Sequence, residues 1–214
     1  MKNLLLSTAL FLGLAAASQA ALTYTVTLDV TSLVGNTNAP FSLDLQMATG
    51  SGNVANSVTI SNFQVTGGSF TGSPVAGGSY SGSFDSTLVI DNTAANTYFA
   101  QEFTAGTTTI TFDVTQTTIS EFVGTGTPIP DQFNVFIDDG NTADGYVPTN
   151  DPSGGNALLV STISAGETVQ DISTYTSGSP DAGVHVTVSA VPEPTSALLL
   201  GLGGLGLFAR RRRA

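Results

Sequence analysis

The feature that most constrains the fold of this chain is an alternation of apolar and polar residues with a period of two. In its first stretch, residues 22–30, every second residue is apolar and the residues between are Thr or Asp. The same alternation recurs over residues 41–47, 109–114 and 184–188. Successive side chains of a strand point to opposite faces of a sheet, so each stretch predicts a strand with one buried face.

Other stretches predict strands that are less regular. Within residues 58–65 the apolar positions change parity, which predicts a β-bulge near Ser61-Asn62. Residues 133–137 and 157–163 are apolar on both faces, which predicts strands in the centre of a sheet. Further strand candidates lie at residues 79–84 and 87–91.

Turn signals rich in glycine separate these strands, at residues 50–52, 67–68, 77–78, 105–106, 139–140 and 154–155. A helical turn is conceivable over residues 92–103, but Tyr98-Phe99 argues against it. About ten short strands joined by such turns predict an all-β fold. We therefore expect residues 21–190 to form a single antiparallel β-sandwich domain that is jelly-roll-like.

The charged residues are divided unevenly along the chain. The five basic residues are Lys2 and residues 210–213, whereas all 16 acidic residues lie between Asp29 and Glu193. Residues 21–190 therefore contain no Lys or Arg, which excludes salt bridges from those side chains and argues against nucleic acid as a partner. The chain has no cysteine, which excludes disulfides, thiol nucleophiles and thiolate metal sites.

Residues 1–20 have the pattern of a secretory signal peptide. Lys2 supplies the positive charge, residues 4–17 form the apolar region, and small residues precede the expected cleavage point. We expect signal peptidase to cut between Ala20 and Ala21, so that the following domain is exported.

Residues 191–214 contain three ordered parts. Val191, Pro192, Glu193 and Pro194 form a stiff, extended segment, because proline fixes φ and the residue before a proline avoids the helical region. Residues 197–209 are apolar and uncharged and would span about 20 Å as a helix, which makes a short transmembrane helix. Arg210, Arg211, Arg212 and Arg213 then act as a stop-transfer signal on the cytoplasmic side. An ordinary short tail anchor is the alternative.

This terminus resembles the PEP-CTERM sorting signal of exosortase substrates. The resemblance rests on the Val-Pro-Glu-Pro segment, the Leu/Gly-rich apolar run and the arginine cluster, in that order. It implies that a membrane-embedded exosortase recognises the tail and cleaves it near Pro192–Pro194, after a stage as an inner-membrane-tethered precursor. It also implies a Gram-negative bacterium that makes an exopolysaccharide or biofilm matrix, with the protein at the cell surface or in that matrix.

Calcium is the one cofactor that the residues suggest. Asp138, Asp139, Asn141 and Asp144 place oxygen ligands of the kind that Ca²⁺ prefers in one loop. The spacing departs from a calcium loop, because Ala143 occupies an alternate position and no glutamate stands at the twelfth. An acidic hairpin loop without a metal is therefore the alternative to a weak Ca²⁺ site.

The chemistry-bearing residues favour a protein that is not an enzyme. The one histidine, His185, falls on the polar face of the last predicted strand, which is typical of a solvated residue. The sequence does not select one pair of carboxylates for hydrolysis. We expect a non-enzymatic surface or matrix protein. The alternative is a carbohydrate-binding or adhesive sandwich that contacts extracellular polysaccharide through Tyr146 or Tyr175.

Overall fold

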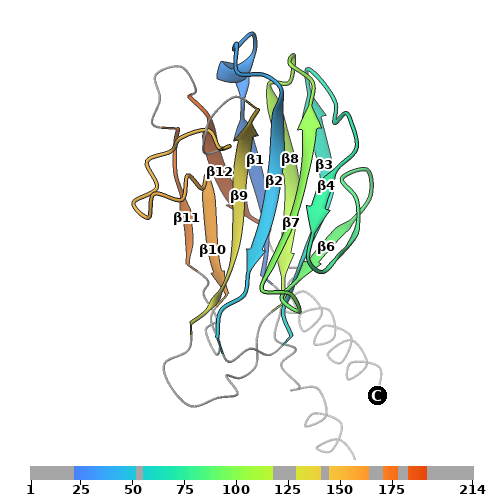
Figure 1. Ribbon diagram of the computed structural model, residues 1–214, viewed down its shortest axis with the longest axis vertical. Helices are drawn as coiled ribbons and strands as arrows, with labels where there is room; N and C mark the ends of the chain where they lie inside the picture. The colour runs from blue at the N-terminus through green and yellow to red at the C-terminus, as the bar shows by residue number, and fades with distance from the viewer. Residues whose placement is uncertain are drawn as a thin grey trace, which may run out of the picture.

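The strands pair into two antiparallel six-stranded sheets that pack face to face (Figure 1). The computed structural model describes residues 22–51, 55–117, 129–140, 145–163, 171–177 and 183–191. Sheet A contains, in spatial order, β12 (His185–Ala190), β1 (Leu22–Asp29), β8 (Thr109–Gln116), β3 (Ser57–Thr66), β6 (Leu88–Asp91) and β5 (Tyr80–Gly82). Sheet B contains β11 (Ile172–Thr174), β10 (Leu159–Ile163), β9 (Asp131–Asp139), β2 (Phe41–Ala48), β7 (Asn96–Phe103) and β4 (Val75–Gly77).

The order of the strands confirms the predicted β-sandwich. The chain changes sheet at each step from β1 to β5, and β7 and β8 then return between strands that are already in place. In sheet A, β8 lies between β1 and β3, and in sheet B, β7 lies between β2 and β4. This interleaving of early and late strands is typical of a jelly roll. The one helical element in the described residues is a short 3-10 helix, η1 (Thr31–Leu33).

The core lies between the two sheets and follows from the period-two alternation. Tyr24, Val26 and Leu28 of β1 are buried, as are Leu43 and Leu45 of β2 in the opposite sheet. Each such side chain contributes about 1.5–3 kcal/mol when it leaves water. Aromatic rings fill one part of this core, with centroids 4.6 to 5.9 Å apart, and belong to Phe63, Phe70, Phe84, Phe99 and Phe112.

The predicted bulge in β3 is confirmed. The register between β3 and β8 shifts between Ser61 and Gln64, and Asn62 adopts the left-handed conformation with φ 55°. Asn is among the residues that tolerate this conformation best. The extra residue changes which side chains face inward, so that Phe63 packs against the core after the inward Val58 and Ile60. The shift of the apolar positions in the sequence therefore marks the place where the pairing of β3 with β8 is interrupted.

Three strands were not predicted from the sequence. β7 occupies most of the stretch where a helical turn was considered. It is a strand because it pairs with β2 and adds its inward Phe99 and Phe103 to the core beside β2. β4 and β11 are three-residue strands at the two edges of sheet B. Strands this short show too few alternating positions for a pattern to be recognised.

A buried carboxylate ties together three segments at one end of the sandwich. Asp131 at the start of β9 is 1% exposed, and its side chain accepts hydrogen bonds from Gly50 N at 2.6 Å and from Asn92 Nδ2 at 2.8 Å. Asn56 Nδ2 donates a third hydrogen bond to it. These neutral donors replace the cation that would ordinarily accompany a buried charge.

We expect Asp131→Ala to destabilise the fold by about 3 kcal/mol, because it removes the acceptor of three hydrogen bonds, two of them from the buried Asn56 and Asn92. Urea unfolding followed by circular dichroism measures this change. The matched control is Asp171→Ala, which removes an exposed carboxylate and should alter the free energy of unfolding by no more than about 0.5 kcal/mol. Equal stability of the two variants would contradict the proposed role of Asp131.

Candidate ligand-binding groove on the outer face of sheet B

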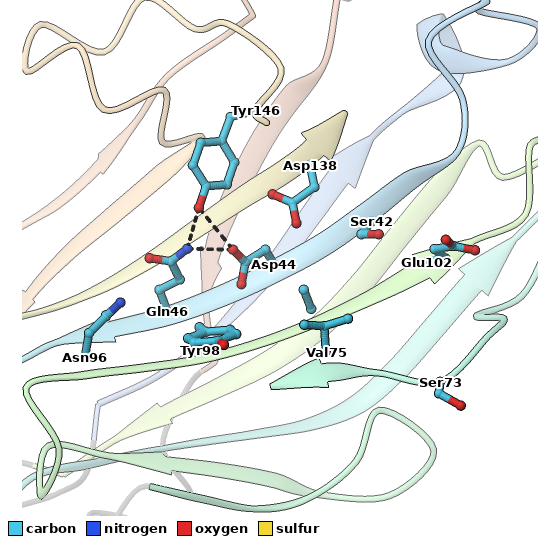
Figure 2. Close-up of a pocket in the computed structure, with 11 residues that line it drawn as sticks. Ser42, Asp44, Gln46, Ser73, Val75, Asn96, Tyr98, Glu102, Asp138 and Tyr146 are labelled. Atoms are coloured by element: carbon cyan, nitrogen blue, oxygen red, sulfur yellow. Dashed lines mark hydrogen bonds between the residues drawn. The ribbon is translucent and has the colours of Figure 1, made fainter. Parts of the chain in front are cut away.

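A groove of about 460 Å³ lies on the outer face of sheet B, on the side away from the core (Figure 2). This volume is within the roughly 300–1,000 Å³ range of ligand pockets. Four strands (β2, β4, β7 and β9) and two connecting segments supply its lining, which consists of Ser42, Asp44, Gln46, Ser73, Val75, Asn96, Tyr98, Ala100, Glu102, Asp138 and Tyr146. Most of the lining residues are polar, with two tyrosine rings among carboxylates and amides.

The strand register brings these side chains together. Asp44 and Gln46 are the outward residues of β2, alternating with the core residues Leu43 and Leu45. Gln46 is paired with Tyr98 of β7, and Ser42 is paired with Asp138 of β9. Paired residues share one face of a sheet, so the polar positions of three adjacent strands form a continuous surface.

Tyr146 closes one side of the groove. Its segment continues sheet B beyond the end of β10, because Tyr146 forms a β-bridge with Asp138 and Val147 N donates to Ile137 O at 2.8 Å. The Tyr146 ring packs on Phe136, with centroids 4.7 Å apart, and Phe136 is 8% exposed. This contact explains why β9 carries apolar residues on both faces, as the sequence showed.

Hydrogen bonds fix the polar centre of the groove. Gln46 Nε2 donates to Asp44 Oδ2 at 2.6 Å and to the Tyr146 hydroxyl at 2.8 Å. The Tyr146 hydroxyl in turn donates to Asp44 Oδ2 at 3.5 Å. Figure 2 shows this triangle, with Asp138 beside it on the neighbouring strand. The three side chains are therefore held in place before any ligand arrives.

Two carboxyl groups in the groove, those of Asp44 and Asp138, have raised pKa values. Asp44 is 3% exposed, and its Oδ1 atom has no hydrogen-bond partner among the described residues. Burial raises the pKa of Asp44. Burial and the nearby charge of Asp44 together raise the pKa of Asp138 to about 7. With no Lys or Arg anywhere in residues 21–190, no such residue offsets this charge.

Tyr98 forms the floor of the groove next to the edge strand β4. A β-carbon added at Gly77 would lie 2.7 Å from Cε1 of the Tyr98 ring, so glycine at this position allows β4 to pack closely against it. Val75, on the same strand, is 66% exposed at the margin of the groove. A second hollow of about 430 Å³ shares Ser42, Glu102, Asp138 and Tyr146 with the first and extends it towards Pro40.

The structure separates two of the residues predicted to bind calcium. Asp138 faces the groove, whereas the adjacent Asp139 is 4% exposed on the other face of β9 and accepts a hydrogen bond from Asn38 Nδ2 at 3.0 Å. Asn141 and Asp144 lie outside the described residues. Within the described ranges no group of three or more His, Cys, Asp or Glu residues is placed to hold a metal ion. The calcium site stays a prediction.

The other predicted residues fall in different places. Tyr146 lines the groove, whereas Tyr175 follows β11 and is not among the lining residues. His185 is exposed on β12, at the edge of sheet A. Asp44, Gln46 and Tyr98 were not predicted, although the outward positions of the alternating strands could have indicated them.

Of the residues predicted for targeting, Val191 alone lies in the described part of the chain. Its backbone N–H donates to Thr23 O of β1 at 3.1 Å, so Val191 continues the pairing of β12 with β1. The predicted cleavage point at Ala20 and Ala21, the segment Pro192–Pro194 and residues 210–213 lie outside the described residues. Among the helical residues that the structure describes, none form a helix long and apolar enough to cross a membrane.

The fold and the groove define an all-β sandwich protein with a ligand-sized site on one outer face. Residues 190–213 match the family model of the PEP-CTERM protein-sorting motif. The chain therefore carries a PEP-CTERM sorting signal, which implies export by exosortase-type sorting, with exosortase as processing partner and a membrane-anchored precursor. Neither a curated protein nor a solved structure matches the chain.

We expect Asp138→Asn to reduce the pH dependence of stability. An unfolded Asp has a pKa of about 4, so the higher pKa in the fold stabilises the protein at low pH, and this stabilisation is lost as pH rises towards 7. The side chain is partly exposed, so we expect a gain of about 1–2 kcal/mol for the variant near pH 8 and none near pH 4. Urea unfolding at both pH values measures it.

The control for this measurement is Asp85→Asn, an exposed carboxylate in the turn before β6. It should leave the difference between the two pH values within about 0.5 kcal/mol of that in the parent protein. If the Asp138→Asn variant kept the pH dependence of the parent protein, the pKa of Asp138 would not be raised in the folded state.

Proposed function

We propose that this is a non-enzymatic, exported surface or extracellular-matrix protein that binds glycan through the groove on sheet B. Exosortase sorts it through residues 191–214, and it is associated with exopolysaccharide or biofilm of a Gram-negative bacterium. The sorting motif at residues 190–213 carries the first part of this proposal. The groove, with Tyr98 and Tyr146 beside Asp44 and Gln46, carries the second.

The chemistry of the groove suits a saccharide. Sugar rings present apolar C–H faces edged by hydroxyl groups, which both donate and accept hydrogen bonds. Tyr98 and Tyr146 offer aromatic surface together with a polar tip, and Gln46, Asn96 and Asp44 offer amide and carboxylate groups around it. Sites of this composition bind ligands by combining ring contact with a few fixed polar groups.

Binding without catalysis is supported by the state of the two carboxylates. Hydrolysis of a glycosidic bond needs one carboxyl group as acid and a second, free carboxylate as base or nucleophile. Asp44 is buried, and Gln46 and Tyr146 occupy its Oδ2 atom, so that only its Oδ1 atom could take either part. The other acidic residues that line the groove with Asp138 are Asp44 and the exposed Glu102. A second carboxylate for such chemistry would have to be one of these two.

We expect Glu193→Ala to block processing of the C-terminal segment while leaving the fold of the sandwich unchanged, because Glu193 is the one charged group in the Pro-Glu-Pro segment. Intact-mass analysis of the protein from an exosortase-containing host measures the length of the tail. Asp85→Ala removes a carboxylate from an exposed turn and serves as the control, with normal trimming. Trimming of the Glu193→Ala variant at the normal position would refute the assigned role.

We expect Tyr146→Ala to weaken glycan binding by at least about tenfold, which corresponds to about 1.4 kcal/mol, through loss of the ring and its hydroxyl. Binding to a glycan array, followed by calorimetry on the best ligand, measures this. Tyr146→Phe retains the packing on Phe136 and separates the role of the hydroxyl from that of the ring. Tyr175→Ala is the matched control outside the groove, and an equal loss in that variant would refute the groove as the site.

A further inference from the structure

We propose that the groove on sheet B selects a cationic amino sugar, a saccharide unit with a free, protonated amino group, whose ammonium lies against Asp44 and Asp138. This inference rests on the proposed glycan-binding function and names the class of glycan. A polymer of hexosamine that has lost part of its N-acetyl groups has this chemistry.

The groove is acidic, which favours a cationic ligand. Its three acidic residues are Asp44, Asp138 and Glu102, and residues 21–190 hold no Lys or Arg to balance them. A glycan with uronate, sulfate or phosphate groups would be repelled by these carboxylates. A neutral sugar would leave their charge uncompensated, whereas an ammonium group would compensate it.

One carboxylate oxygen of Asp44 lacks a hydrogen-bond donor, which favours a ligand that donates hydrogen bonds. Asp44 is 3% exposed and lines the groove, and its Oδ1 atom lacks a hydrogen-bond partner among the described residues. A buried acceptor left in this state costs about 1–3 kcal/mol. An ammonium group carries three donors and no acceptor, so it suits a site with two neighbouring carboxyl groups such as those of Asp44 and Asp138. Figure 2 shows both carboxylates next to Tyr146 on adjacent strands.

The shape of the site favours an organic cation over a metal ion. Ca²⁺ takes six to eight oxygen ligands that converge on one point, whereas the groove's carboxylates are spread over three strands, β2, β7 and β9. The described residues contain no group of three acidic or histidine side chains placed for a metal. Tyr98 and Tyr146 add ring faces, which attract cations and contact the apolar face of a sugar.

The test is calorimetry of the full chain with four probes: an oligomer of glucosamine, its fully N-acetylated counterpart, an oligomer of galacturonic acid, and CaCl₂ alone. We expect the glucosamine oligomer to bind at least about tenfold more tightly than the acetylated one, and its affinity to fall as salt is added. The uronic acid oligomer should not bind. In Asp44→Asn and in Asp138→Asn the two glucosamine-based oligomers should bind with similar affinity.

The matched control is Asp85→Asn, which makes the same charge change on an exposed turn outside the groove. It should keep the full preference for the amino sugar. Equal binding of both oligomers to the parent protein, or an equal loss of preference in Asp85→Asn and Asp44→Asn, would overturn this inference while leaving glycan binding in place. Calcium binding that Asp44→Asn abolishes, without amino-sugar binding, would overturn it too. Failure of every saccharide to bind would remove the proposed function itself.

Discussion

The absence of Lys and Arg from residues 21–190 is the constraint on which the rest of the structure depends. Carboxylates in this domain have to be stabilised by neutral donors. Two asparagines and a backbone amide surround Asp131, while Thr25 and Asn62 donate to Asp113 on the outer face of sheet A. Side-chain amides and hydroxyls thus replace ion pairs, and burial of the core with the pairing of the strands supplies the stability.

Neutral donors satisfy Asp44 only in part. Gln46 and Tyr146 satisfy one of its oxygens, and the other stays without a partner in the described part of the chain. Natural proteins seldom leave a buried polar atom in this state, and such an atom needs an explanation. Its place in a groove, next to Asp138 with its raised pKa, makes a ligand the simplest explanation.

The two outer faces of the sandwich differ for a reason that the register makes clear. On sheet A, threonines face each other across the strands, as in the pairs Thr23–Thr115 at 3.1 Å and Thr27–Thr111 at 3.4 Å, and they form a short-chained surface. On sheet B, longer polar and aromatic side chains stand around shorter ones, and Tyr146 rises over Phe136 from a separate segment. The groove therefore depends on the outward side chains of sheet B.

The sequence by itself determined the all-β class, the long strands other than β7, the bulge near Asn62 and the sorting motif, because each depends on local periodicity or on a contiguous segment. Tertiary structure alone decided which outward residues meet. Asp44, Tyr98 and Tyr146 are far apart in the chain, and only the register of β2 with β7 and β9 makes them neighbours. It also extended β9 through Asp139, beyond the predicted residues 133–137, and this places Asp138 and Asp139 on opposite faces of the sheet.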